Sequence, residues 1–144
     1  MSNFVSFLGE SLLSEKGKGN VETSSLDQVP VIALYFSAHW CPPCKMFTPK
    51  LRQFYNEVNS SSKKLEIVWI SADEDEEEFN EYFEEMPWLS MPFDPSDLRE
   101  EVSEKFDIAS IPQLVILNKD GTVKSATGKA EVEQKGASAF DSWH

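Results

Sequence analysis

The chain has 144 residues, a formal net charge of −12 and two cysteines. This length fits one domain, residues 1–144, and the acidic charge argues against nucleic acid and anionic membranes as partners, because phosphate groups would repel it. Two cysteines are too few for a secreted domain stapled by disulfides, so they indicate redox or metal chemistry in a reducing compartment. We expect a cytoplasmic protein, with the nucleus as the alternative, since neither a signal peptide nor a membrane span is recognisable.

Apolar residues recur at helical spacing near the N-terminus and predict a short amphipathic helix over residues 3–13. The residues that carry this spacing are Phe4, Phe7, Leu8 and Leu12. A loop over 14–20 and a short edge strand over 21–23 follow. Residues 31–37 are apolar almost throughout, which is typical of a central strand buried on both faces.

The next predicted element is a helix from Pro42 to Val58. Prolines suit its first turn, because the amides there have no helical partner. Pro49 lies inside the helix and predicts a kink. A polar turn over 60–64 then leads to a second apolar strand over 65–71.

Acidic residues dominate the segment 73–78, which opens another helix that ends before Pro87. Negative side chains near a helix N-terminus complement the positive end of its dipole. We therefore interpret this run as a solvated helix start rather than a metal site.

The C-terminal part predicts a helix over 98–106 followed by a β-hairpin. Its strands, 113–117 and 122–125, flank the turn signal Asn118-Lys-Asp-Gly121. Residues 127–144 form a tail with weak signals. The order of strand, helix, strand, helix and hairpin predicts a central sheet covered by helices on both faces.

The segment Trp40-Cys41-Pro42-Pro43-Cys44 lies between the first central strand and the helix that follows it. This is the carboxyl end of the strand, where open α/β sheets place their active sites. Cys41 should cap the helix, so its thiolate faces unpaired amides and the pKa should fall below the free value of about 8.5. Because Pro42 and Pro43 carry no N–H, we expect the pKa to stay above the extreme low values of strong oxidants. The second thiol can close a small disulfide ring, which predicts dithiol–disulfide exchange.

Several segments, in this order, resemble the tryparedoxin and nucleoredoxin branch of the thioredoxin superfamily. They are Tyr35–Cys44, Phe47–Leu51, Met86–Phe93 and Phe106–Val115, and the similarity covers about residues 3–126. The resemblance implies a thioredoxin fold, an α/β architecture with a central mixed β-sheet flanked by helices on both faces. An N-terminal extension over about 1–29 would precede a core of about 30–126 and the tail 127–144.

The resemblance also assigns roles to individual residues. Cys41 would be the nucleophile that forms a mixed disulfide, and Cys44 the thiol that resolves it. Pro112 would follow a cis peptide bond and lie against the cysteines, leaving the Ile111 backbone free to pair with an extended substrate. Trp40 would be an apolar platform for the partner. The dithiol itself carries the electrons, so no other cofactor is implied.

Other positions support or modify this assignment. Tyr35 stands where thioredoxins bury an aspartate, and a phenol with a pKa of about 10 is a poor base at neutral pH. Water or a carboxylate must then take the proton of the resolving thiol, and Glu74 matches a family carboxylate near the site. Tyr82 matches another residue near the site, and Trp88 fits a packing role. For His39, tuning of the nucleophile and an ordinary loop position both stay open.

Two positions depart from tryparedoxins and favour a nucleoredoxin-like chain. Ala72 stands where tryparedoxins carry a tryptophan, and Lys129 where they carry an arginine. Lysine keeps the charge but loses the planar fork of donors.

These observations predict a protein-disulfide reductase that acts as a monomer. It would take electrons from a small thiol or a flavoprotein reductase and pass them to protein disulfides such as those of peroxidases. The alternatives are a redox-dependent binding protein of the nucleoredoxin type and a metal or cluster scaffold bridging two chains.

Overall fold

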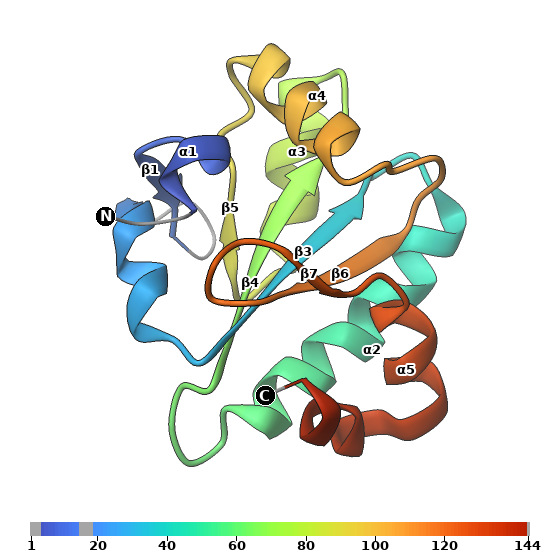
Figure 1. Ribbon diagram of the computed structural model, residues 1–144. Coiled ribbons are helices and arrows are strands. Elements are labelled where there is room, and N and C mark those ends of the chain that lie inside the picture. The colour runs from blue at the N-terminus through green and yellow to red at the C-terminus, as the bar shows by residue number, and fades with distance from the viewer. Residues whose placement is uncertain (1–3, 15–18, 144) are drawn as a thin grey trace.

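The computed structural model describes residues 4–14 and 19–143, which form a mixed sheet with helices on both faces (Figure 1). The sheet order is β2-β1-β5-β4-β3-β6-β7. The strands are β1 (Ser11–Leu13), β2 (Asn20–Glu22), β3 (Val31–Ser37), β4 (Leu65–Ser71), β5 (Leu89–Ser90), β6 (Gln113–Leu117) and β7 (Val123–Ser125). The α-helices are α1 (Val5–Leu8), α2 (Pro42–Val58), α3 (Glu76–Phe83), α4 (Ser96–Lys105) and α5 (Gly128–Lys135). Two 3-10 helices are η2 (Thr23–Gln28) and η3 (Gly136–Ser142).

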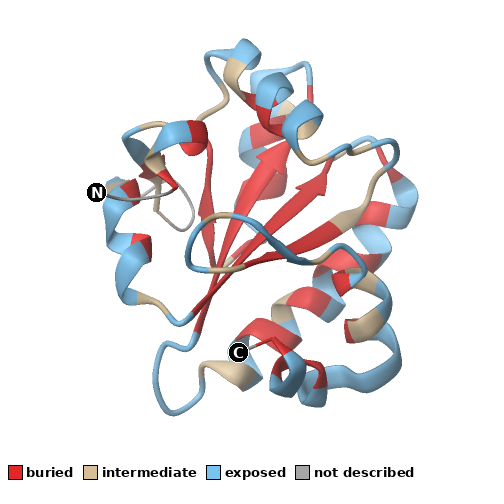
Figure 2. Ribbon diagram, viewed as in Figure 1, coloured by how far each residue is buried: buried red, intermediate tan, exposed pale blue. Residues whose placement is uncertain are grey.

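Strand β3 lies at the centre of the fold, parallel to β4 and antiparallel to β6. Every residue of β3 and β4 is buried, as Figure 2 shows by their colour. Burial on both faces explains why these strands are apolar without alternation. The predicted strands over 31–37 and 65–71 are confirmed, as is the mixed sheet with helices on both faces.

Side chains of β3 alternate between two hydrophobic clusters, one on each face of the sheet. Val31, Ala33 and Tyr35 pack in the cluster that includes residues of α2, α3 and α5. The side chains between them pack in the other cluster, with residues of α1, η2 and α4. The sheet therefore separates two cores, and the helix that carries the cysteines covers only one of them.

Most of the predicted helices are confirmed. Helix α2 begins at Pro42, continues through Pro49 and ends at Val58, as expected. The acidic run does open a helix: Asp75 caps α3 and accepts hydrogen bonds from the amides of Glu77 (2.7 Å) and Glu78 (3.4 Å).

No described helix has the length and apolar character needed to cross a membrane.

The helix predicted over 3–13 is wrong in extent. Helix α1 spans only Val5–Leu8 and ends at Gly9, whose φ of 86° is a left-handed conformation that favours glycine. The chain then enters β1, which pairs with the edge strand β2 near the predicted position. The apolar residues behind the prediction are buried, with Leu12 inside a strand rather than a helix. Residue 3, and residues 15–18 of the predicted loop, lie outside the described residues.

The C-terminal tail folds into two elements that the sequence did not predict, α5 and η3. Gly128 lets α5 approach β6 closely, because a Cβ there would lie 2.7 Å from the carbonyl oxygen of Leu114. Further along, Trp143 is 2% exposed and its ring lies 5.2 Å from that of Phe54 on α2. The tail is therefore part of the core that lies under α2.

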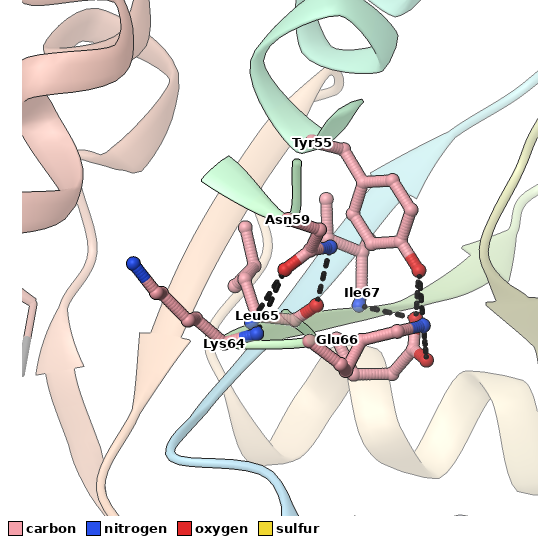
Figure 3. A network of polar contacts seen from close by, with 7 residues as sticks. Tyr55, Asn59, Lys64, Leu65, Glu66 and Ile67 are labelled. Atoms are coloured by element: carbon pink, nitrogen blue, oxygen red, sulfur yellow. Dashed lines mark hydrogen bonds and ion pairs between the residues drawn. The ribbon is translucent and has the colours of Figure 1, made fainter. Parts of the chain in front are cut away.

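A polar network joins the end of α2 to the beginning of β4 (Figure 3), whereas the cysteines lie at the start of α2. The carboxylate of Glu66, 6% exposed, accepts hydrogen bonds from the Tyr55 hydroxyl (2.9 Å) and the Lys63 ammonium (3.0 Å). The Asn59 amide donates to the carbonyl of Leu65 and accepts from its N–H, both at 3.0 Å. These contacts fix the register with which the chain leaves α2 and enters the sheet.

We expect Trp143→Ala to lower the free energy of unfolding by about 3 kcal/mol or more, as for other buried aromatic truncations. The loss would show that the tail stabilises the whole core. Urea unfolding followed by circular dichroism measures it, with Val123→Ala, at a position 45% exposed, as the control. A Trp143→Ala midpoint equal to that of the control would contradict the packing described here.

Candidate active site

Cys41 and Cys44 lie at the start of α2 and form a disulfide, with their Cα atoms 5.2 Å apart. Cys41 is the N-cap, Pro42 and Pro43 are the first two helical residues, and the amide of Cys44 donates to the Sγ atom of Cys41 at 3.3 Å. The predicted capping position of Cys41 is confirmed. Because the prolines lack N–H groups, the Cys44 amide is the first donor of the helix that can face this sulfur.

The two sulfurs differ in access. Cys44 is completely buried, while Cys41 is 5% exposed beside surface residues. Trp40 is 56% exposed, and Pro42 and Pro43 are also exposed. Met46, one turn into the helix, is 71% exposed, so the chain on both sides of Cys41 carries exposed apolar side chains.

The segment before β6 completes this surface. The peptide bond between Ile111 and Pro112 is cis, as predicted. The carbonyl oxygen of Ile111 lies 4.0 Å from Cys41 Sγ, and the Ile111 side chain packs against Ala38 and both cysteines. The structure thus brings Ile111 and Pro112 to the cysteines across 70 residues of chain. A second cis bond, Asp94–Pro95, was not predicted.

Buried hydroxyl groups lie beneath the first turn of α2. Thr48 Oγ1 donates to the Cys44 carbonyl at 3.0 Å, and the Tyr35 hydroxyl reaches the same carbonyl at 3.4 Å. Thr48 also bonds to the hydroxyls of Tyr35 (2.6 Å) and Tyr82. Sequence reasoning identified both tyrosines but missed Thr48, which its position four residues after Cys44 could have suggested.

Burial keeps these phenols neutral. Desolvation, and then the proximity of Tyr82, raises the pKa of Tyr35 well above its ordinary value of about 10. Desolvation likewise raises the pKa of Tyr82. The network therefore satisfies the Cys44 carbonyl without providing a base.

The carboxylate that touches the active-site loop is Asp73, which the sequence analysis did not select. Asp73 is 1% exposed and accepts hydrogen bonds from the His39 amide (2.8 Å) and the Ser71 hydroxyl (2.9 Å). Its neighbour Glu74, the predicted proton acceptor, is exposed and lines a separate pocket. Among the described residues, no hydrogen bond joins Glu74 to either cysteine.

The His39 ring turns toward α3. Its Nε2 atom lies 3.7 Å from a Glu81 carboxylate oxygen, and the His39 and Tyr82 rings pack in a T-shaped arrangement with their centres 5.8 Å apart. In the described ranges, no group of three or more His, Cys, Asp or Glu side chains is arranged to hold a metal ion.

Comparison with known proteins agrees with this geometry. The model of the family described as thioredoxin-like matches residues 30–123. The chain belongs to this family. It is 42% identical over 137 residues to a probable nucleoredoxin 1 of Arabidopsis thaliana, covering 90% of this chain and 24% of the relative. It is 43% identical over 122 residues to tryparedoxin of Trypanosoma brucei brucei, covering 83% of this chain and 82% of that one.

Solved structures give the same result. The structure of tryparedoxin from Trypanosoma brucei is similar with a TM-score of 0.89 and 37% identity, covering 99% of both chains. The chain spans only about a quarter of the length of the curated nucleoredoxins it matches. The matched segment has the thioredoxin-like fold and carries its own cysteine pair, Cys41 and Cys44, as a disulfide.

We expect the stability of this thioredoxin-like chain to fall as the pH rises above about 10, the ordinary pKa of tyrosine. The unfolded chain loses the phenolic protons there, whereas the folded chain keeps them because the pKa of Tyr35 is raised, so ionisation favours unfolding. Urea unfolding between pH 8 and 11 measures the slope. Tyr35→Phe should flatten it, and an unchanged slope would contradict the neutral, buried phenol.

Proposed function

We propose that this thioredoxin-like chain reduces disulfides of partner proteins, with Cys41 as nucleophile and Cys44 as resolving thiol. The observation that carries the proposal is the asymmetry of the pair. Cys41 caps the helix, keeps 5% of its surface exposed and accepts an amide hydrogen bond, while Cys44 is 0% exposed. The sulfur at the N-cap is the more accessible of the two and is stabilised as a thiolate, so it attacks first.

The proposed reaction has two exchanges. In the reduced protein, the Cys41 thiolate attacks one sulfur of a substrate disulfide, forms a mixed disulfide and releases the other substrate sulfur as a thiolate. Cys44 then loses its proton and attacks Cys41 Sγ, which releases the second substrate thiolate. The intramolecular disulfide described above is the oxidised product, and two electrons have moved to the substrate.

We propose that the substrate docks on the apolar surface around Cys41. Trp40 offers an exposed ring on one side, and the Ile111 carbonyl lies near the sulfur on the other. Pro112 has no amide, which leaves room for a partner backbone beside Ile111. Exposed proline and tryptophan side chains supply rigid contact area at low cost in conformational entropy.

Proton removal from Cys44 is assigned to solvent and a nearby carboxylate. The phenols of Tyr35 and Tyr82 are unsuited, because burial raises the pKa of each. Glu74 stays the proposed acceptor, acting from its exposed position through water.

The proposed electron donor is a small thiol or a flavoprotein reductase, and the proposed substrates include peroxidases. A tryparedoxin II has been solved in complex with glutathionylspermidine. Ala72 and Lys129 stand at positions where tryparedoxins carry larger or forked side chains, so we place this chain nearer the nucleoredoxins. We propose a monomer in the cytoplasm, with the nucleus as the alternative.

A second function is favoured by the similarity to nucleoredoxins, at 38% identity over 129 residues for the bovine protein. The chain would then hold or release a partner according to the state of Cys41 and Cys44. Under this alternative Cys41→Ser still binds its partner, and the wild-type protein turns over no protein disulfide.

We expect Cys44→Ser to accumulate a covalent adduct with insulin, a protein with accessible disulfides. Attack by Cys41 still occurs in this variant, but no thiol remains to resolve the mixed disulfide. Mass spectrometry under non-reducing conditions measures the adduct. Cys41→Ser is the control and should form none, and an adduct in that variant alone would reverse the two roles.

The redox potential of the pair tests the direction of the reaction. We expect a value between roughly −200 and −270 mV, the range of thioredoxins and glutaredoxins. Equilibration in glutathione buffers, followed by alkylation and mass spectrometry, measures it. A value of about −120 mV, that of a strong oxidant, would overturn the reductase assignment.

A further inference from the structure

Arg99 is a buried arginine on α4 whose hydrogen bonds go to backbone carbonyls, while the Asp73 carboxylate is its largest charge partner. It is 6% exposed, and its donors bind the carbonyl oxygens of Phe93 (2.8 Å), Ser71 (2.6 Å) and Asp73 (3.2 Å). The guanidinium also lies 4.7 Å from the centre of the Phe93 ring. None of the ion pairs among the described residues involves Arg99. Burying a charge is costly, so this set of hydrogen bonds fixes the backbone that accepts them.

The loop held by Arg99, residues 71–73, is also tied to the end of β3. The amide of Ala72 donates to the Ser37 carbonyl at 3.0 Å. The Asp73 carboxylate is fixed within the loop by the Ser71 hydroxyl at 2.9 Å. Its other oxygen accepts the His39 amide at 2.8 Å. The loop is thus rigid on the side of α4 and presents one buried acceptor to the active-site segment.

His39 occupies the middle of the turn that ends at the attacking sulfur. The Cys41 amide donates to the Ala38 carbonyl at 3.2 Å, which closes a turn with His39 and Trp40 at its centre. The orientation of this turn decides where Cys41 Sγ lies relative to the Cys44 amide. The hydrogen bond from the His39 amide to Asp73 therefore helps to fix the position of Cys41 Sγ at the helix N-cap.

We propose that Asp73 and Arg99 are positioning residues for Cys41: Arg99 fixes the loop 71–73, and Asp73 holds the turn that aims the sulfur at the helix N-terminus. The inference rests on the proposed role of Cys41 as nucleophile. Neither residue touches the reacting atoms, and neither belongs to the Trp40 or Ile111 surface. The contribution is one of geometry, carried by the acceptor oxygen of Asp73 rather than by its charge.

The test uses paired variants of the full chain. Asp73→Ala removes the acceptor, while Asp73→Asn keeps an oxygen that can accept the His39 amide and removes the charge. His39→Pro removes the amide donor at a turn position that proline favours, and His39→Ala removes only the imidazole. Arg99→Met removes the donors on α4 and keeps an apolar stem.

The matched controls lie outside this connection. Glu66→Gln changes another buried carboxylate, at the opposite end of β4 from Ser71. Arg52→Met removes another arginine that donates to a backbone carbonyl, that of Glu85 at 2.9 Å. These control variants show how much the melting temperature changes when a comparable carboxylate or arginine is lost away from the active site.

The readouts are the pKa of Cys41 by thiolate absorbance and the rate of its reaction with a small aromatic disulfide, with the melting temperature measured alongside. We expect Asp73→Ala, His39→Pro and Arg99→Met to lower this rate at least about fivefold and to raise the pKa, as loss of a buried hydrogen bond predicts. Asp73→Asn, His39→Ala and the controls should stay within about twofold.

Two results would overturn the proposal. One is a lower melting temperature in the first three variants with unchanged pKa and rate, which would make the connection purely structural. The other is Asp73→Asn as impaired as Asp73→Ala, which would assign the effect to charge. Where Arg99→Met or Asp73→Ala fails to fold, the His39 pair decides alone. A wild-type protein that reduces no protein disulfide would refute the proposed function and leave these measurements valid.

Discussion

The site depends on the pairing of β3 with two unlike neighbours, β4 parallel and β6 antiparallel. Ser37 at the end of β3 lies opposite Ser71 at the end of β4, and Phe36 lies opposite Gln113 at the start of β6. The C-terminal ends of β3 and β4 therefore lie beside the N-terminal start of β6. The cysteines, the loop of Asp73 and the cis bond before Pro112 meet there because of this topology.

At that edge, the start of α2 determines the chemistry of the sulfurs. Two prolines suit the first helical positions and remove their amides, so the Cys44 amide becomes the donor nearest Cys41. The same turn buries Cys44 completely and leaves Cys41 5% exposed. A single local arrangement thus separates the attacking sulfur from the resolving one and gives the attacking sulfur its electrostatic support.

Sequence reasoning succeeded where local pattern decides the outcome. The bounds of α2, both central strands and the capping position of Cys41 all follow from motifs or apolar runs, whereas the cis bond before Pro112 was implied by the family resemblance. It failed where distant contacts decide. Helical spacing could not distinguish α1 from the strand that holds Leu12, because the apolar residues of both pack in the same hydrophobic cluster. Asp73 looked like one more residue of a solvated acidic run. Only the fold brings Asp73 and Arg99 to the turn of His39.

Charge is distributed unevenly around the cysteines, and this has a consequence for the reaction. Beneath α2 the polar groups are hydroxyls, which burial keeps neutral, whereas the buried carboxylate nearby, Asp73, is engaged by hydrogen bonds from backbone and hydroxyl donors. A neutral network costs less to bury than a carboxylate, so Tyr35 can lie in the middle of the core. The proton of Cys44 has no basic acceptor among these hydroxyls, which is why the proposed route leads through water to Glu74.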